Sequence, residues 1–268
     1  MDGFDGVLSK KRLGQVFLVN RSVADAEAAH AEGKVVIEIG PGMGMLTRSL
    51  CMEAKKVIAV EKDFRLYTIL KHELPLKNLV LINKDFLRAT DEELELDEVD
   101  IMISNIPYYL SSSVVGWLAE KKMQAVLCLQ KEFVEHMLAK PDTRSYSKLS
   151  VFTSLLFRIT KIMDVPKGNF RPVPKVDSAV IYMKPLDNEV SRRKLELIGL
   201  VMQHKKKTVR NAIMDSHSHF GMKKGDMTEI AAGVSHSGSR VFKLRPEEIL
   251  GIARELESAL GEGSRAKK

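Results

Sequence analysis

The chain has 268 residues, 44% of them hydrophobic and 29% charged, and a formal net charge of +7 at pH 7. This balance is typical of a folded globular protein with a sizeable core. No segment approaches the roughly 18 consecutive apolar residues of a membrane span, and the opening MDGFDGVLSKKRLG has acidic residues where a signal peptide needs a basic and then an apolar run. We therefore expect a cytoplasmic protein with no membrane partner.

The positive charge is concentrated in the last third of the chain. Residues 188–268 hold 16 Lys and Arg against 10 Asp and Glu, whereas residues 1–187 hold 26 against 25. A localised basic surplus is typical of a protein that binds nucleic acid or another anionic surface, and it is also compatible with an ordinary solvated face.

From residue 34 onward, short apolar runs that predict strands alternate with helical patterns. The expected strands are KVVIEIG (34–40), KKVIAVEK (55–62), NLVLINKD (78–85), VDIMIS (99–104) and MQAVLCLQ (123–130). The expected helices between them are MLTRSLCMEA (45–54), FRLYTILKHEL (64–74) and SSVVGWLAEK (112–121). This alternation predicts a mostly parallel sheet covered on both faces, which is a doubly wound, Rossmann-like α/β domain.

The later part of the chain changes character. The segment NFRPVPKVDSAVIYMKP (169–185) has prolines followed by an alternating pattern, so we expect a late strand of the sheet, with antiparallel pairing left open. Beyond it, helical periods cover 192–204, 207–215 and 245–260. The sequence therefore predicts an α/β domain over residues 1–187 and a small all-helical domain over 188–268.

The two cysteines, Cys51 and Cys128, lie in apolar surroundings. This setting favours buried free thiols in a reducing compartment over a disulfide.

Three successive strand ends carry residues that suit an adenosine. The first strand ends in EIGPGMGMLT, where Gly40, Gly42 and Gly44 let the backbone approach a ligand and a helix N-terminus follows. Glu61 follows the second strand, where dinucleotide folds place an acceptor for ribose hydroxyls. Asp85 and Phe86 follow the third, and they suit an adenine amino group and its ring. Each feature alone also fits a purely structural turn or a solvated strand end, and together they do not distinguish NAD from S-adenosylmethionine.

The segment NIPYYLSS (105–112) favours methyl transfer. The side-chain oxygen of Asn105 and the carbonyl of Ile106 can accept both hydrogens of an exocyclic amino group, which aims the nitrogen lone pair at a methyl donor. Pro107 fixes the chain direction and Tyr108 offers a face for a base. The amino nitrogen of adenine is a poor nucleophile, so positioning must supply most of the catalysis. We expect Ser111 or Ser112 to cap the following helix.

These motifs resemble, in order and along nearly the whole chain, those of the rRNA adenine N6,N6-dimethyltransferase family of the kasugamycin-resistance type, and an archaeal member is expected. The matching segments are KKRLGQVFLVN, EIGPGMGMLT, VEKD, KDFL, NIPYYLSS, LQKEFVEHMLAKP, FRPVPKVDSAV and HKKKTVRNAI. The resemblance implies a class I methyltransferase fold, S-adenosylmethionine as cofactor, and a pair of adjacent adenosines near the 3′ end of small-subunit rRNA, in free RNA or an immature subunit, as substrate. It also implies a monomer.

The resemblance implies roles for particular residues. Cofactor-binding residues are expected to be Gln15, Val16, Leu18, Gly40, Gly42, Gly44, Glu61, Lys62, Asp85, Phe86 and Asn105. Catalytic residues are expected to be Asn105, Pro107, Tyr108 and Phe170, of which Phe170 either covers the flipped adenine or anchors its loop to the core. Val16 departs from the family, which usually has Asn or His there, so a side-chain contact at that position is lost while a backbone contact survives.

RNA-binding residues are expected to be Arg171, Lys175, Lys205, Lys206, Lys207 and Arg210, with Lys206 and Arg210 on one helical face. The histidines of SHSHF (216–220) invite a metal interpretation, but no Cys or carboxylate cluster completes a site, so no metal is expected.

Two other functions fit parts of the sequence. A NAD-dependent oxidoreductase explains the glycines and Glu61 but gives no role to Asn105, Pro107 and Tyr108. A ribosome-assembly or nucleic-acid-binding factor without turnover would use the same scaffold, although the retained acids and Asn105 argue against it.

Overall fold

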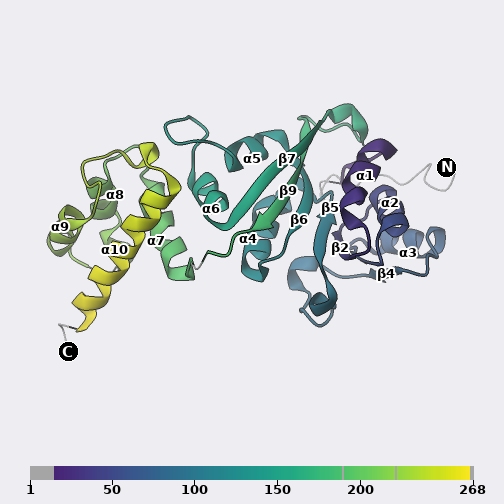
Figure 1. Cartoon of the computed structure of the whole chain (residues 1–268), viewed down its shortest axis with the longest axis horizontal. Coiled ribbons are helices and arrows are strands. Elements are labelled where there is room, and N and C mark those ends of the chain that lie inside the picture. The colour runs from purple at the N-terminus through teal and green to yellow at the C-terminus, as the bar shows by residue number, and fades with distance from the viewer. Residues whose placement is uncertain (1–14, 189, 221, 266–268) are drawn as a thin grey trace. The chain divides into compact units, whose positions relative to one another are not determined.

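The computed structural model describes residues 15–188, 190–220 and 222–265 of the chain (Figure 1). Contacts divide it into two compact units. The first contains the described residues up to Val134 together with Ile159–Pro185, and the second contains Glu135–Arg158 together with the described residues from Leu186 onward. In the described part of the chain, no helix has both the length and the apolar character that crossing a membrane requires.

The first unit is built on a seven-stranded sheet with the order β4-β3-β2-β5-β6-β9-β7 (Figure 1). Its strands are β2 (Val35–Ile39), β3 (Lys56–Val60), β4 (Leu79–Ile82), β5 (Ile101–Ser104), β6 (Ala125–Gln130), β7 (Phe157–Val165) and β9 (Ser178–Pro185). The strands from β2 to β6 pair in parallel, whereas β9 pairs with β6 antiparallel. The predicted doubly wound sheet is confirmed, and its late strand is antiparallel.

Crossover connections join the parallel strands, because a parallel pair cannot be joined by a tight turn. The helices α2 (Met45–Glu53), α3 (Phe64–Glu73) and α4 (Ser111–Lys121) follow β2, β3 and β5, and two 3-10 turns, Phe86–Arg88 and Leu96–Glu98, lie between β4 and β5. The helix α1 (Arg21–Ala28) precedes β2, and α5 (Lys131–Met137) follows β6. A separate two-stranded sheet joins β1 (Phe17–Leu18) antiparallel to β8 (Phe170–Arg171).

The sheet buries both of its faces. On one face, alternate strand residues such as Val36, Ile101 and Ile103 form one apolar cluster with residues of α1 and α2. On the other face, Ile37 and Met102 are also fully buried. Successive side chains of a strand point to opposite faces, so the register determines which helices each side chain meets.

The second unit is helical. It contains α6 (Lys148–Leu156), α7 (Arg192–Gln203), α8 (Val209–Asp215), α9 (Lys224–Gly233) and α10 (Pro246–Arg265). Residues 135–158 belong to it, which differs from the predicted boundary after residue 187. The reason is packing: Tyr146 is fully buried in the apolar cluster of this unit, and its Oη donates a 2.8 Å hydrogen bond to the carbonyl of Leu244. The tasks predicted for the two parts stay predictions.

The predicted cap of α4 is wrong. The helix begins at Ser111 itself, directly after the 3-10 turn Tyr108–Leu110, and its N-cap residue Leu110 has helical backbone angles and no capping side chain. The hydroxyl of Ser111 instead donates a 2.8 Å hydrogen bond to the carbonyl of Tyr108. The serine therefore closes the turn that carries Tyr108.

Candidate active site

A cleft of about 300 Å³ lies at the carboxyl ends of the parallel strands in the first unit. This edge is where doubly wound sheets bind ligands, and the volume is at the lower end of the range of small-molecule sites, roughly 300–1,000 Å³. Most of the predicted cofactor and catalytic residues line it: Gln15, Val16, Gly40, Gly42, Glu61, Lys62, Asp85, Phe86, Asn105, Pro107, Tyr108 and Phe170. The structure therefore brings these residues together from widely separated positions in the chain.

The turn after β2 requires glycine for two different reasons. Gly40, Gly42 and Gly44 all have positive φ angles, of 65°, 59° and 75°. A Cβ on Gly42 would lie 2.8 Å from Cδ1 of Phe17, so this glycine permits a close approach to the strand beside the cleft. A Cβ on Gly44 would lie 2.7 Å from Cδ1 of Leu74, so that glycine permits packing of α2 against α3.

Gly44 and Leu18, which were predicted to bind the cofactor, are not among the residues that line the cleft. Gly44 is the N-cap of α2, and the side chains of Leu70 in α3 and Leu74 just after it lie close to where its Cβ would be. Leu18 is 6% exposed and belongs to the apolar cluster between the sheet and α1. The structure gives both residues a packing role.

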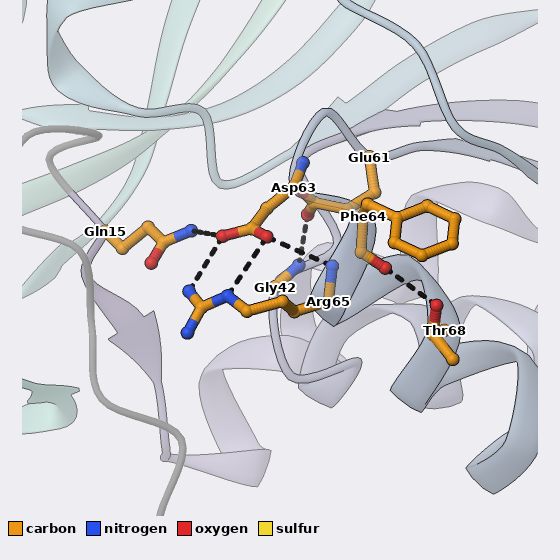
Figure 2. A network of polar contacts seen from close by, with 7 residues as sticks. All are labelled: Gln15, Gly42, Glu61, Asp63, Phe64, Arg65 and Thr68. Atoms are coloured by element: carbon orange, nitrogen blue, oxygen red, sulfur yellow. Dashed lines mark hydrogen bonds and ion pairs between the residues drawn. The ribbon is translucent and has the colours of Figure 1, made fainter.

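Glu61 and Asp63 form a polar network beside the glycine turn (Figure 2). Glu61 accepts hydrogen bonds from the backbone nitrogens of Asp63, at 2.7 Å, and Gly42, at 3.3 Å. Burial raises the pKa of the Glu61 carboxyl, while these N–H groups oppose the rise. The carboxylate is thus held at the turn, with lone pairs left for a ligand's hydroxyl groups.

Asp63 lies within the VEKD motif but was not predicted to be a site residue. Its carboxylate caps α3 through the backbone nitrogen of Arg65, at 3.1 Å, and pairs with the Arg65 guanidinium, at 2.9 Å. It also accepts a 3.1 Å hydrogen bond from Nε2 of Gln15, so it lies between that amide and the guanidinium (Figure 2). Asp63 therefore joins the segment at Gln15 to the start of α3.

Asp85 lies at the outer part of the cleft. It accepts a 2.8 Å hydrogen bond from Nζ of Lys62, and this lysine lowers the pKa of the Asp85 carboxyl. The carboxylate also accepts from the backbone nitrogen of Leu87, at 3.2 Å. The next residue, Phe86, is 3% exposed and packs edge-on against Trp117, with ring centroids 4.8 Å apart. Asp85 is therefore ionised and held in place at neutral pH.

The segment after β5 supplies an amide and a phenol. Both polar side-chain atoms of Asn105 are buried and form no hydrogen bond of ordinary geometry among the described residues. A buried amide in that state costs free energy, so its position suits a polar partner. The hydroxyl of Tyr108 lies 2.8 Å from Oγ of Ser178, and burial raises the pKa of the phenol, which therefore stays protonated at neutral pH.

Phe170 has an anchoring role in this structure. It lies in β8, opposite Leu18 of β1. Its side chain belongs to the apolar cluster that the sheet forms with α1 and α2. It is only 3% exposed. The ring also lines the cleft, and its base-covering role stays a prediction.

The predicted RNA-binding residues fall in both units. In the first unit, Arg171 and Lys175 are exposed, and the Arg171 guanidinium donates a 2.9 Å hydrogen bond to the carbonyl of Phe170. In the second unit, Lys205 donates to the carbonyl of Tyr146, and Lys207 pairs with Asp215 at 2.5 Å. Lys205 and Lys207 are therefore already engaged within the unit.

Lys206 and Arg210 were predicted to share a helical face, and this prediction is wrong. Thr208 caps α8, which begins at Val209, so Lys206 lies in the preceding turn. The backbone there instead forms a β-bridge between Thr208 and Arg240. Lys206, Arg210 and Arg240 are all exposed, and none has an ion-pair partner within the described ranges. Arg240 was missed because its proximity depends on this long-range bridge.

The metal interpretation of the SHSHF histidines concerns residues of the second unit. Within the described ranges, no group of three or more His, Cys, Asp or Glu side chains could hold a metal ion. His217 contacts the carbonyl of Met214 through Nδ1, at 3.0 Å.

Comparison with known proteins identifies the family. Residues 7–257 match the family described as ribosomal RNA adenine dimethylase. The chain is 38% identical over 268 residues to the probable ribosomal RNA small subunit methyltransferase A of Methanopyrus kandleri, covering 96% of this chain and 95% of that protein. It is 36% identical over 262 residues to the protein of the same description from Pyrococcus abyssi, covering 96% and 94%. The fold is similar to the crystal structure of a dimethyladenosine transferase from Plasmodium falciparum, with a TM-score of 0.78, 25% identity, and coverage of 90% and 98%.

The match extends over most of the sequence, and six of the eight segments that carry the resemblance contribute residues to one cleft. This family match favours methyl transfer over hydride transfer as the chemistry of the cleft. The chain belongs to the ribosomal RNA adenine dimethylase family.

Proposed function

We propose that the protein dimethylates the N6 amino groups of two adjacent adenosines near the 3′ end of small-subunit rRNA, in an immature small subunit. The coarser activity, dimethylation of adenine in small-subunit rRNA with S-adenosylmethionine as donor, follows from family membership. The observation that carries the proposal is that the buried Asn105 amide, which forms no hydrogen bond of ordinary geometry among the described residues, lines the same cleft as Glu61 and Asp85.

The residues of the cleft fit the cofactor. Glu61 and Asp85 place carboxylates at the ends of neighbouring strands, where the ribose hydroxyls and the adenine amino group of an adenosyl compound need acceptors. Gly42 keeps the turn free of a side chain. When bound, S-adenosylmethionine supplies a methyl group on a positively charged sulfur.

The remaining chemistry falls to the chain. The lone pair of an adenine amino nitrogen is delocalised into the ring, so orienting that nitrogen matters more than a strong base. We assign this task to Oδ1 of Asn105 and the carbonyl of Ile106, which accept the two amino hydrogens. Pro107 fixes their direction, and Tyr108, held by Ser178, presents its ring to the base.

The first expected outcome concerns Asp85. Asp85→Ala should weaken S-adenosylmethionine binding by about 1–3 kcal/mol, the range for a hydrogen bond to a charged group. Asp85→Asn keeps an acceptor oxygen and should lose less. Calorimetric titration measures both, with Asp91→Ala as the control, because Asp91 pairs with Lys121 outside the cleft. Unchanged affinity in Asp85→Ala would remove this residue from the cofactor site.

The second expected outcome concerns RNA. Replacing Lys206, Arg210 and Arg240 together with alanine should weaken RNA binding and reduce the slope of log affinity against log salt by up to about 0.9 per lost phosphate contact on duplex. The matched control replaces Arg192, Arg193 and Lys194, three cations of α7 that already pair with acidic residues. Equal slopes in the two triple variants would assign Lys206, Arg210 and Arg240 to a solvated face.

The proposed location of the protein rests on its cysteines. Cys51 and Cys128 are free, as expected in a reducing compartment such as the cytoplasm. We also propose that the protein acts as a monomer.

Transfer of labelled methyl groups tests the function. The protein should move label from S-adenosylmethionine to immature small subunits, and it should bind S-adenosylmethionine in preference to NADH. Binding to the subunits without transfer would instead favour a non-catalytic assembly factor. Comparing immature subunits with free rRNA determines whether an assembled particle is required.

A further inference from the structure

Glu27 is an acidic residue in an unusual position. It lies on α1, is fully buried, and neither of its carboxyl oxygens has a hydrogen-bond partner of ordinary geometry among the described residues. Buried carboxyl groups in proteins are normally paired, because an unpaired one is costly. The residue plays no part in the chemistry described above, so the structure leaves its presence unexplained.

Glu27, on α1, and Asn105, just past the end of β5, lie on the same side of the sheet. Ile101 and Ile103 of β5 pack in the cluster formed with α1 and α2, and Asn105 continues this alternation just past the end of the strand. Asn105 contributes a side-chain hydrogen-bonding interaction to the Glu27 carboxyl, although neither side chain forms a hydrogen bond of ordinary geometry among the described residues. The two groups are therefore complementary neighbours.

Glu38 and Cys128 also face the Glu27 carboxyl, from β2 and β6. Burial raises the pKa of Glu27 well above its usual value, Glu38 raises it further, and the Asn105 amide opposes the rise. Burial also raises the pKa of Glu38 to about 8, while its hydrogen bond from Thr47 opposes the rise. A neutral carboxylic acid at position 27 keeps a carbonyl oxygen that can accept a hydrogen bond.

We propose that Glu27 is a positioning residue for Asn105: its carboxyl oxygen accepts a hydrogen bond from Nδ2 of Asn105, which directs Oδ1 of the amide toward the target amino group. An amide can rotate by half a turn and exchange its donor and acceptor with little change of shape. A fixed acceptor behind Nδ2 removes that alternative, so Asn105 presents the acceptor that methyl transfer needs. The inference rests on the proposed function, since it concerns the orientation of the same amide.

Glu27→Leu and Glu27→Gln separate positioning from packing. Leucine keeps a similar volume without an acceptor, so the single-turnover methylation rate at saturating cofactor and RNA should fall about ten- to a hundredfold. Glutamine keeps a neutral acceptor oxygen, so the rate should stay within about threefold of the parent. Cofactor affinity should be unchanged in both. The control is Asp25→Asn on the same helix, which should keep the parent rate. It removes a carboxylate that accepts a hydrogen bond from the hydroxyl of Ser49.

The side-chain NH₂ signal of Asn105 in an NMR spectrum, assigned by its loss in Asn105→Ala, gives a readout that does not need activity. In the parent and in Glu27→Gln it should exchange slowly with solvent, and in Glu27→Leu it should shift and exchange faster. An unchanged rate in folded Glu27→Leu would overturn the inference while leaving the proposed function intact. If Glu27→Leu does not fold, the NMR signals of the parent and of Glu27→Gln decide. An Asn105 amide that exchanges freely in the parent would overturn the inference, and an Asn105 amide that exchanges slowly in both proteins would support it. An inactive parent enzyme would count against the proposed function, and the NMR comparison would still decide the role of Glu27.

Discussion

Asn105→Ala is expected to lower the rate of methyl transfer on the order of a hundredfold or more, while leaving S-adenosylmethionine and RNA binding largely intact. The amide is assigned to orient the target nitrogen, and its acceptor matters most as positive charge develops on that nitrogen. Removing one oriented polar group from an active site typically costs about a hundredfold to a thousandfold in rate. Single-turnover methylation at saturating cofactor measures this loss directly.

The control for this variant is Asn78→Ala. Asn78 also carries a partly buried amide, but it donates to the carbonyls of Cys51 and Ala54, away from the cleft. That substitution should leave the methylation rate per folded molecule unchanged. If Asn105→Ala transferred methyl groups at the parent rate, or if it lost cofactor affinity to the same extent as rate, the orienting role would be wrong.

Phe170→Ala is expected to lower the free energy of unfolding of the first unit by about 3–5 kcal/mol, the usual cost of removing a phenylalanine from a core. The ring is 3% exposed and lies in the cluster that joins β8 to the sheet. Urea unfolding monitored by circular dichroism measures the change. Phe170→Leu keeps most of the apolar volume and should cost less than about 1.5 kcal/mol if the cluster repacks around it.

Phe170→Leu also distinguishes the two roles considered for this residue. If Phe170 only anchors its segment, the leucine variant should methylate structured and single-stranded RNA at nearly the parent rate. If the ring stacks on an extruded adenine, the variant should be slower, and more so on structured RNA, because extruding a base costs a few kcal/mol that stacking offsets. A stability loss below about 1 kcal/mol in Phe170→Ala would contradict the anchoring role.

The central strands of the sheet could be predicted because buried parallel strands are nearly continuous apolar runs, as in β2 and β5. The strand β7 was not predicted. Its nine residues are buried at the two ends and mostly exposed or half-buried between them, and they include Arg158, Lys161 and Asp164, so their pattern resembles that of a surface segment. The helix α9 was missed because its ten residues include glycine at both Gly225 and Gly233.

Residues 135–158 show a second limit of prediction from the sequence, which concerns long-range packing. Their local pattern does not encode which apolar cluster they join, and the structure places Tyr146, Val151 and Leu155 in the cluster of the second unit. The same limit applies to Arg240, which reaches the neighbourhood of Lys206 and Arg210 through one bridge. Contacts between segments distant in sequence are determined by packing.

Much of the cleft could be predicted because each residue follows a strand whose carboxyl end lies at one edge of the sheet. Glu61, Asp85 and Asn105 are examples. The residues that could not be predicted are those that position or pack against the residues of the cleft. Glu27 lies between alanines on a short helix with several polar positions, so its sequence pattern does not differ from that of a solvated side chain. Gly44 shares its motif with Gly40 and Gly42, and only the position of Leu74 shows that it has a packing role.

Mapping the modified nucleosides identifies which atoms of which adenosines receive methyl groups. Immature small subunits are incubated with S-adenosylmethionine and either the parent protein or Asn105→Ala, and rRNA fragments are then analysed by mass spectrometry. We expect N6,N6-dimethyladenosine at two adjacent positions near the 3′ end with the parent protein and a strongly reduced amount with the variant. Methylation at another atom, methylation of unrelated RNA, or equal modification by both proteins would contradict the proposed function.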